Sequence, residues 1–152
     1  WSSDVCSSDL PRLVEAIDKG ADLAIGSRYV RGGNTPDWPL TRRLISKGGN
    51  LYARIMLGIP AHDATAGFRA YRAEALQALP YRAAQASGYA FQVEMAMRAY
   101  ENGLNVVEVP ITFRDRTRGT SKMGTDIVVE AMRLVTVWGW QRAVRGVRSW
   151  GR

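Results

Sequence analysis

The chain has 152 residues, of which 46% are hydrophobic and 23% are charged, a composition that suits one globular domain with a real core. Its charge is unbalanced, because 21 lysines and arginines stand against 14 acidic residues and give a net charge of +7. Such a chain should bind anions: nucleic acid, a phosphorylated ligand or an acidic membrane. A single cysteine, Cys6, excludes an internal disulfide framework, and a single histidine, His62, excludes a multi-histidine metal site.

No apolar run approaches the ~18 residues that are needed to cross a bilayer. The N-terminus also lacks the basic start and apolar middle of a signal peptide, so we expect a cytoplasmic protein. Residues 1–10, WSSDVCSSDL, repeat the triplet SSD and follow neither helical nor strand periodicity. We interpret them as a non-native or disordered segment.

Residues 11–20 open with proline and close with glycine, as a short helix should. Residues 21–27 then indicate a buried strand, followed by a loop rich in glycine, proline and asparagine. A second helix should run to about residue 57. Thr41 can cap it, and the side chains that we expect to face inward are Leu44, Leu51 and Ile55.

The second half of the chain continues the alternation of strands and helices. A loop enters a short strand near residues 69–72, and a brief helix follows at 73–79. A strong helix covers residues 88–100, a strand with a proline at an edge or bulge position covers 105–113, and a long helix covers 125–147. This pattern predicts an α/β fold. About three strands are few for such a sheet, so other strands are cryptic or part of the domain is missing.

Two clusters of basic residues follow strand ends, where α/β folds usually place ligands. The first is the loop FRDRTRGTSKMG, whose polar residues include Arg114, Arg116, Arg118, Ser121 and Lys122. The second cluster comprises Arg28, Arg42, Arg43 and Ser46, of which Arg42 and Ser46 share one helical face. Each cluster either is a solvated surface or binds phosphate, and the two meeting in one pocket would favour phosphate binding.

Other polar residues have more than one reading each. In DATAGFRAYR, Asp63 either orients an arginine, meets a sugar hydroxyl or forms an Asx turn, with Thr65 and Arg69 nearby. Gln92 and Glu94 interrupt an apolar helix. Glu94 either faces a pocket, where it bonds a sugar or holds a basic residue, or lies at the surface.

Five segments occur in an order that resembles a known family: GSRYVRGG, WPLTRRLISKGGNLYAR, DATAGFRAYR, GYAFQVEM and VVEVPITFRDRTRGTSKM. Together they are similar to the C-terminal two-thirds of polyprenol-phosphate (dolichol-phosphate) mannosyltransferases, which are family 2 glycosyltransferases. The resemblance implies an N-terminally truncated GT-A-type, Rossmann-like fold. Residues 11–124 would be the C-terminal part of that domain, and residues 125–152 would be an amphipathic helix with a basic tail.

The resemblance also implies a reaction: inverting transfer of mannose from GDP-mannose to a polyprenyl monophosphate. In such enzymes the equivalents of Arg28, Arg42 and Ser46 hold the acceptor phosphate. The basic loop, with Arg116, Arg118 and Lys122, closes over the phosphates. Our candidates for substrate binding, chosen from the residues themselves, are Asp63, Thr65, Arg69, Gln92, Glu94 and Ser121.

The family carries an Asp-x-Asp motif for Mg²⁺ or Mn²⁺ just before the Leu-Pro that matches residues 10–11. Here WSSDVCSSDL stands in that place, and Asp4 and Asp9 do not reproduce the motif. We therefore expect a fragment that lacks the metal ligands and the nucleotide half, and that is inactive alone.

The last helix carries tryptophans among arginines, which suits either peripheral contact with the cytoplasmic face of an anionic membrane or a helix that packs on the core and has a frayed basic end. A membrane-anchoring partner subunit is a further possibility. Rival interpretations are a transferase of glucose or another hexose, a remnant that only binds polyprenyl phosphate, and a basic nucleic-acid-binding module. The last would need aromatic residues spread over a binding sheet, so we expect no nucleic acid partner.

Overall fold

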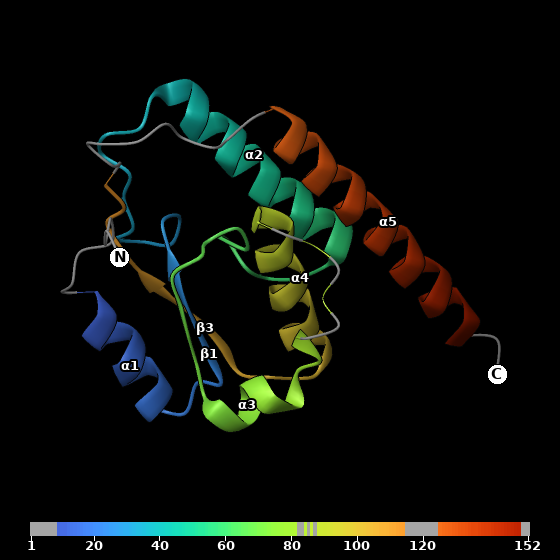
Figure 1. Ribbon diagram of the computed structural model, residues 1–152, viewed down its shortest axis with the longest axis horizontal. Helices are drawn as coiled ribbons and strands as arrows, with labels where there is room; N and C mark the ends of the chain where they lie inside the picture. Colours follow the sequence, from blue (N-terminus) through green and yellow to red (C-terminus); the bar gives the residue numbers. More distant parts are fainter. Residues whose placement is uncertain (1–8, 82–83, 85, 87, 115–124, 150–152) are drawn as a thin grey trace.

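Three strands form one mixed sheet in the computed structural model, which describes residues 9–81, 84, 86, 88–114 and 125–149 (Figure 1). The central strand β1 (Leu23–Ser27) pairs in parallel with β3 (Val106–Pro110) and antiparallel with β2 (Arg69–Tyr71). Pro110 ends β3 on the outer side of this three-stranded sheet, the edge position predicted for it. The α/β class predicted from the sequence is confirmed.

The helices match the predicted ranges to within two residues at each end. They are α1 (Leu10–Asp18), α2 (Leu40–Leu57), α3 (Ala73–Ala78), α4 (Gly88–Glu101) and α5 (Thr125–Ser149). None of these described helices combines the length and the apolar composition needed to span a membrane.

Helices cover both faces of the sheet, which is why every residue of β1 is buried. Leu23 and Ile25 point to one face and pack with Met95 of α4, whereas Ala24 points to the other and packs with Leu13 of α1. Figure 1 shows the resulting order, with α1 on one side of the sheet, α4 on the other, and α2 and α5 side by side beyond α4. The sheet packing thereby fixes the position of β1, whose last residue precedes the site described below.

Helices α2, α4 and α5 share a separate core that includes Ala53, Val93 and Val135. Gly139 lets α5 approach α2 closely, because a Cβ atom at Gly139 would lie 2.7 Å from the carbonyl oxygen of Met56. The inward face predicted for the last helix is confirmed for its described side chains. Ala131, Leu134, Val135 and Trp138 are buried or half-buried, and the side chain of Ile127 lies outside the described part.

Two predictions for α2 are wrong. Pro39, not Thr41, occupies the N-cap, and no side chain caps the helix. The leucines and isoleucine expected inside are also exposed: 60% for Leu44, 55% for Leu51 and 70% for Ile55. They form an outer stripe, because the opposite face of α2 packs inward and buries Asn50, Ala53 and Leu57. That inner face lines the site described next.

Candidate functional site

Arg28 follows the last residue of β1 and is held by a carboxylate from a distant loop. Its Nε donates to Oδ2 of Asp63 at 2.7 Å, and its Nη2 donates to Oδ1 at 2.6 Å. The backbone N–H of Arg28 also donates to Oδ2, at 3.0 Å. This two-pronged geometry matches the planar fork of a guanidinium to a carboxylate and fixes its orientation.

The Arg28–Asp63 pair is almost wholly removed from water, with Asp63 0% and Arg28 8% exposed. Burial alone would lower the pKa of Arg28, but the hydrogen bonds and charge of Asp63 outweigh it, so the pKa of Arg28 is raised and the side chain stays charged. Both carboxylate oxygens of Asp63 already accept hydrogen bonds. Of the three readings of Asp63, the structure therefore shows the arginine-orienting one.

Glu108 on β3 fixes the loop that carries Asp63. Its carboxylate accepts hydrogen bonds from the backbone N–H of Asp63 at 2.9 Å and of His62 at 2.8 Å, and it also bonds Nδ1 of His62. Sequence reasoning missed this residue. Its signal was a lone charged residue in the otherwise apolar strand VVEVP.

Helix α2 is tied to the same loop through Asn50 and Thr65. The Asn50 amide donates to Oγ1 of Thr65 at 3.0 Å and accepts from its backbone N–H at 3.2 Å. Thr65 also accepts from Nη2 of Arg28 at 2.9 Å. Near the start of the helix, Tyr29 donates its phenolic proton to Oγ of Ser46 at 2.6 Å. One connected network thus positions Arg28 and Ser46 relative to each other.

Trp38 brings the two predicted guanidinium groups together. The Cζ atoms of Arg28 and Arg42 lie 5.1 and 4.1 Å from its ring centroid, within the range of cation–π attraction. The ring is only 6% exposed, and its indole N–H has no hydrogen-bond partner in the described part of the chain. Sequence reasoning missed Trp38, whose one signal was its place just before an arginine pair.

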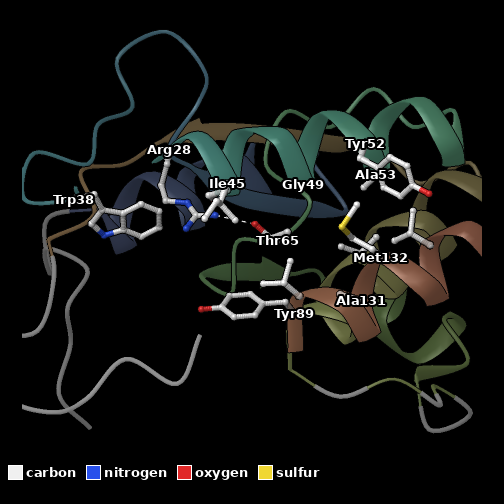
Figure 2. Close-up of a pocket in the computed structure, with 14 residues that line it drawn as sticks. Arg28, Trp38, Ile45, Gly49, Tyr52, Ala53, Thr65, Tyr89, Ala131 and Met132 are labelled. Atoms are coloured by element: carbon white, nitrogen blue, oxygen red, sulfur yellow. Dashed lines mark hydrogen bonds between the residues drawn. The ribbon is translucent and has the colours of Figure 1, made fainter. Parts of the chain in front are cut away.

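A pocket opens beside this network, between α2, α4 and α5 (Figure 2). Figure 2 shows Trp38, Arg28 and Thr65 toward one end and Tyr52, Ala53 and Met132 toward the other. The residues that line it are Arg28, Trp38, Ile45, Ser46, Gly49, Tyr52, Ala53, Thr65, Tyr89, Val93, Val128, Ala131, Met132 and Val135. The pocket therefore offers one cation, Arg28, with the hydroxyl groups of Ser46 and Thr65 at one end, and a largely apolar wall over the rest; Arg42 is not among its lining residues.

Other predicted residues have different partners or lie elsewhere. The guanidinium of Arg69 donates to the carbonyl oxygens of Ala66 and Ala64, and Glu94 is buried and pairs with Arg98 at 2.6 Å. Glu94 thus holds a basic residue, one of its predicted readings, but neither Arg69, Glu94 nor Gln92 lines the pocket. Arg116, Arg118, Ser121 and Lys122 lie outside the described residues.

The described residues do not fit a divalent metal ion. Within them, no three histidine, cysteine, aspartate or glutamate side chains come together where they could ligate one. The Mg²⁺ or Mn²⁺ expected from the resemblance is therefore assigned to no residue of this part of the chain.

Fold and site together define a mixed α/β domain whose strand end and neighbouring helix present cations beside an apolar pocket. The family model for glycosyl transferase family 2 matches residues 3–79. The chain belongs to glycosyltransferase family 2, as the resemblance indicated.

Several relatives carry more specific names. The chain is 51% identical to a polyprenol monophosphomannose synthase of Mycolicibacterium smegmatis over 131 residues, 86% of this chain and 49% of the relative. It is also 51% identical to an undecaprenyl-phosphate mannosyltransferase of Micrococcus luteus, over 92% of this chain and 57% of the relative. A dolichol-phosphate mannosyltransferase of Pyrococcus furiosus is 39% identical over 82% of this chain and 34% of the relative. The chain thus spans about half the length of the two most similar of these three.

Proposed function

We propose that this chain is the acceptor-binding part of an enzyme that transfers mannose from GDP-mannose to a polyprenyl monophosphate. The single observation that carries the proposal is the pocket, which has Arg28 and Ser46 at one end and an apolar wall along the rest. A lipid monoester has the same polarity: a doubly charged head followed by an isoprenoid tail. By their names, one of the three relatives makes polyprenol monophosphomannose, and the other two are mannosyltransferases of undecaprenyl phosphate and dolichol phosphate.

The proposed chemistry needs little from the protein beyond alignment and charge. A phosphate monoester is already ionised at neutral pH, so its oxygen can attack the anomeric carbon without a strong general base. The new C–O bond forms on the face opposite the departing GDP, which gives inversion. Arg28, Arg42 and the hydroxyl of Ser46 would lower the repulsion between two anionic reactants and hold the attacking oxygen in line. The loop of residues 113–124 remains our candidate for closing over the phosphates.

We further propose that the chain acts peripherally at the cytoplasmic face of a membrane, either directly or beside an anchoring subunit. The outer stripe of α2 (Leu44, Leu51 and Ile55) is apolar and exposed, and so is Leu40 at the start of the helix. Lys47 and Arg54 are exposed on the same helix. Apolar side chains flanked by cations suit the surface of an anionic bilayer, where a polyprenyl lipid resides.

The acceptor proposal can be tested by binding to vesicles. The chain should bind vesicles containing undecaprenyl phosphate more tightly than vesicles of equal charge made with phosphatidylglycerol. Arg42→Ala should remove that preference, with a loss of about tenfold in affinity for the polyprenyl phosphate vesicles, because a charge-assisted contact to phosphate disappears. Arg54→Ala is the matched control: it removes the same charge from the same helix, and should weaken binding to both vesicles equally. Equal binding of the unaltered chain to both vesicles would contradict the proposal.

Transfer itself should require the remaining half of the enzyme. We propose that the 152-residue chain alone does not move mannose, since it matches only about half the length of two of its relatives. Joining it to the part of the Mycolicibacterium smegmatis relative that precedes the match should give transfer from GDP-mannose but not from UDP-glucose. Turnover by the 152-residue chain alone would refute the fragment proposal, and a preference for UDP-glucose would refute the donor.

A further inference from the structure

The hydroxyl of Ser46 is set by a neighbour that lies outside helix α2. Ser46 lines the polar end of the pocket, and its Oγ accepts the phenolic proton of Tyr29 at 2.6 Å. Tyr29 is two residues past the end of β1, so the contact joins the strand end to the helix. The bond is short and partly buried, as expected for O–H···O pairs that are well aligned.

A serine hydroxyl has one proton to donate and two lone pairs to accept with. Because Tyr29 donates to Oγ, the proton of Ser46 must point elsewhere. Among the described residues, Oγ of Ser46 donates no hydrogen bond: the amide of Asn50 bonds the backbone carbonyl of Ser46, not its side chain. The Ser46 proton is therefore left for an acceptor in the pocket.

The phenol of Tyr29 is kept in the form that can donate. Burial raises the pKa of Tyr29, so its phenolic hydroxyl remains protonated at neutral pH. The Cζ atom of Arg28 lies 5.2 Å from the centroid of the Tyr29 ring, and Nζ of Lys47 lies 5.7 Å from the same centroid. Two cations around the ring hold it in place next to the pocket.

We propose that Tyr29 is a positioning residue for the acceptor phosphate: its hydroxyl fixes Ser46 as an acceptor so that the single Ser46 proton is donated to a phosphate monoester oxygen held beside Arg28. The inference rests on the proposed acceptor function. Tyr29 does not touch the phosphate itself in this arrangement, so its effect on binding passes entirely through Ser46.

The test is a double-mutant cycle with farnesyl phosphate, a short lipid monoester, as the titrated ligand. Tyr29→Phe and Ser46→Ala should each weaken binding by about three- to tenfold, as the loss of one directed hydrogen bond predicts. The double variant should bind no more weakly than Ser46→Ala alone, since the two residues form one unit. Ser46→Thr keeps the hydroxyl, so it should bind nearly as tightly as the unaltered chain. Adding Tyr29→Phe to Ser46→Thr should then weaken binding, as it does in the unaltered chain.

The control is Tyr100→Phe, a half-buried tyrosine on α4 that lies in the core and away from the pocket. It should leave affinity unchanged, and thermal unfolding of every variant shows whether the fold is kept. A Tyr29→Phe variant that binds as tightly as the unaltered chain, or a double variant that adds both losses, would overturn the inference and leave the proposed function standing. Binding of farnesyl phosphate no tighter than that of farnesol would overturn both.

Discussion

Arg28 can serve a ligand through only part of its guanidinium. Its Nε and Nη2 are committed to Asp63 and Thr65, which leaves Nη1 without a partner among the described residues. The benefit is orientation, because a long flexible side chain is reduced to one rotamer before any ligand arrives. The cost is that a charged pair is kept out of water, so each member depends on the other.

Asp63→Asn should therefore destabilise the fold strongly. The substitution leaves the buried guanidinium of Arg28 with no opposing charge and puts an amide donor against it. We expect the free energy of unfolding to fall by about 3 kcal/mol, the usual result of breaking a buried ion pair from one side. Chemical denaturation at neutral pH measures this change.

Glu15→Gln is the comparison for that experiment. Glu15 pairs with Lys19 at 2.6 Å, but both side chains are exposed to solvent, so the unfolding midpoint should not move. A loss below about 1 kcal/mol for Asp63→Asn would mean that water reaches Arg28 and that the pair does not preorganise it.

Local patterns predicted the arginines but not the residues that organise them. Arg28 could be singled out because it follows a buried strand, and Asp63 because it sits in a polar loop. The weak signals of Trp38 and Glu108 do not reveal what these residues do, and neither does the place of Tyr29 in the sequence, since their roles depend on contacts with residues far along the chain. Glu108, for example, bonds a residue 45 positions away. Such contacts exist only after the sheet and α2 have come together.

At the level of elements, α2 illustrates how a correct range can conceal a wrong face. Its boundaries follow from local sequence, but its inward face was assigned to the largest apolar residues. The structure instead buries Asn50, Ala53 and Leu57. Small residues there allow α5 to come near, and polar ones build the site. Hydrophobicity alone assigns the outer stripe to the core. This prediction fails for α2 because the face that packs inward also carries the polar residues of the site.

The approach of α5 to α2 should depend on Gly139. A methyl group there would lie 2.7 Å from the Met56 carbonyl oxygen and 3.1 Å from its Cε, so the two helices must separate. Gly139→Ala should lower the free energy of unfolding by about 1–3 kcal/mol, as overpacked cores do. It should also weaken farnesyl phosphate binding, because the pocket lies between these helices. Denaturation and titration of the same preparation measure the two effects.

Gly48→Ala provides the opposite expectation within α2. A methyl group at Gly48 would meet no atom within 4 Å, and the position is exposed. Replacing a helical glycine by alanine should therefore stabilise the fold by roughly 0.5–1 kcal/mol. If Gly139→Ala stabilised the protein to the same extent, the close contact between α2 and α5 would not exist in solution.

For the whole molecule, net charge and exposed apolar area together indicate which kind of anionic partner the protein binds. The net charge of +7 favours any anionic partner, so charge alone does not choose between a membrane and other polyanions. The outer stripe of α2 favours the membrane. Burying exposed leucine and isoleucine side chains in a bilayer is favourable in free energy, whereas contact with a polyanion in water buries little of their apolar area.

Leu51→Gln with Ile55→Gln should accordingly reduce binding to anionic vesicles by roughly tenfold, since two half-exposed apolar side chains no longer enter the acyl boundary. The matched control is Leu10→Gln with Val14→Gln, which removes similarly exposed side chains, 53% and 47%, from α1 on the other side of the sheet (Figure 1). Co-sedimentation with vesicles of phosphatidylglycerol measures both pairs at one ionic strength. Equal losses for the two pairs would show that adsorption is unspecific, and no loss for the α2 pair would show that cations alone attach the protein to the membrane.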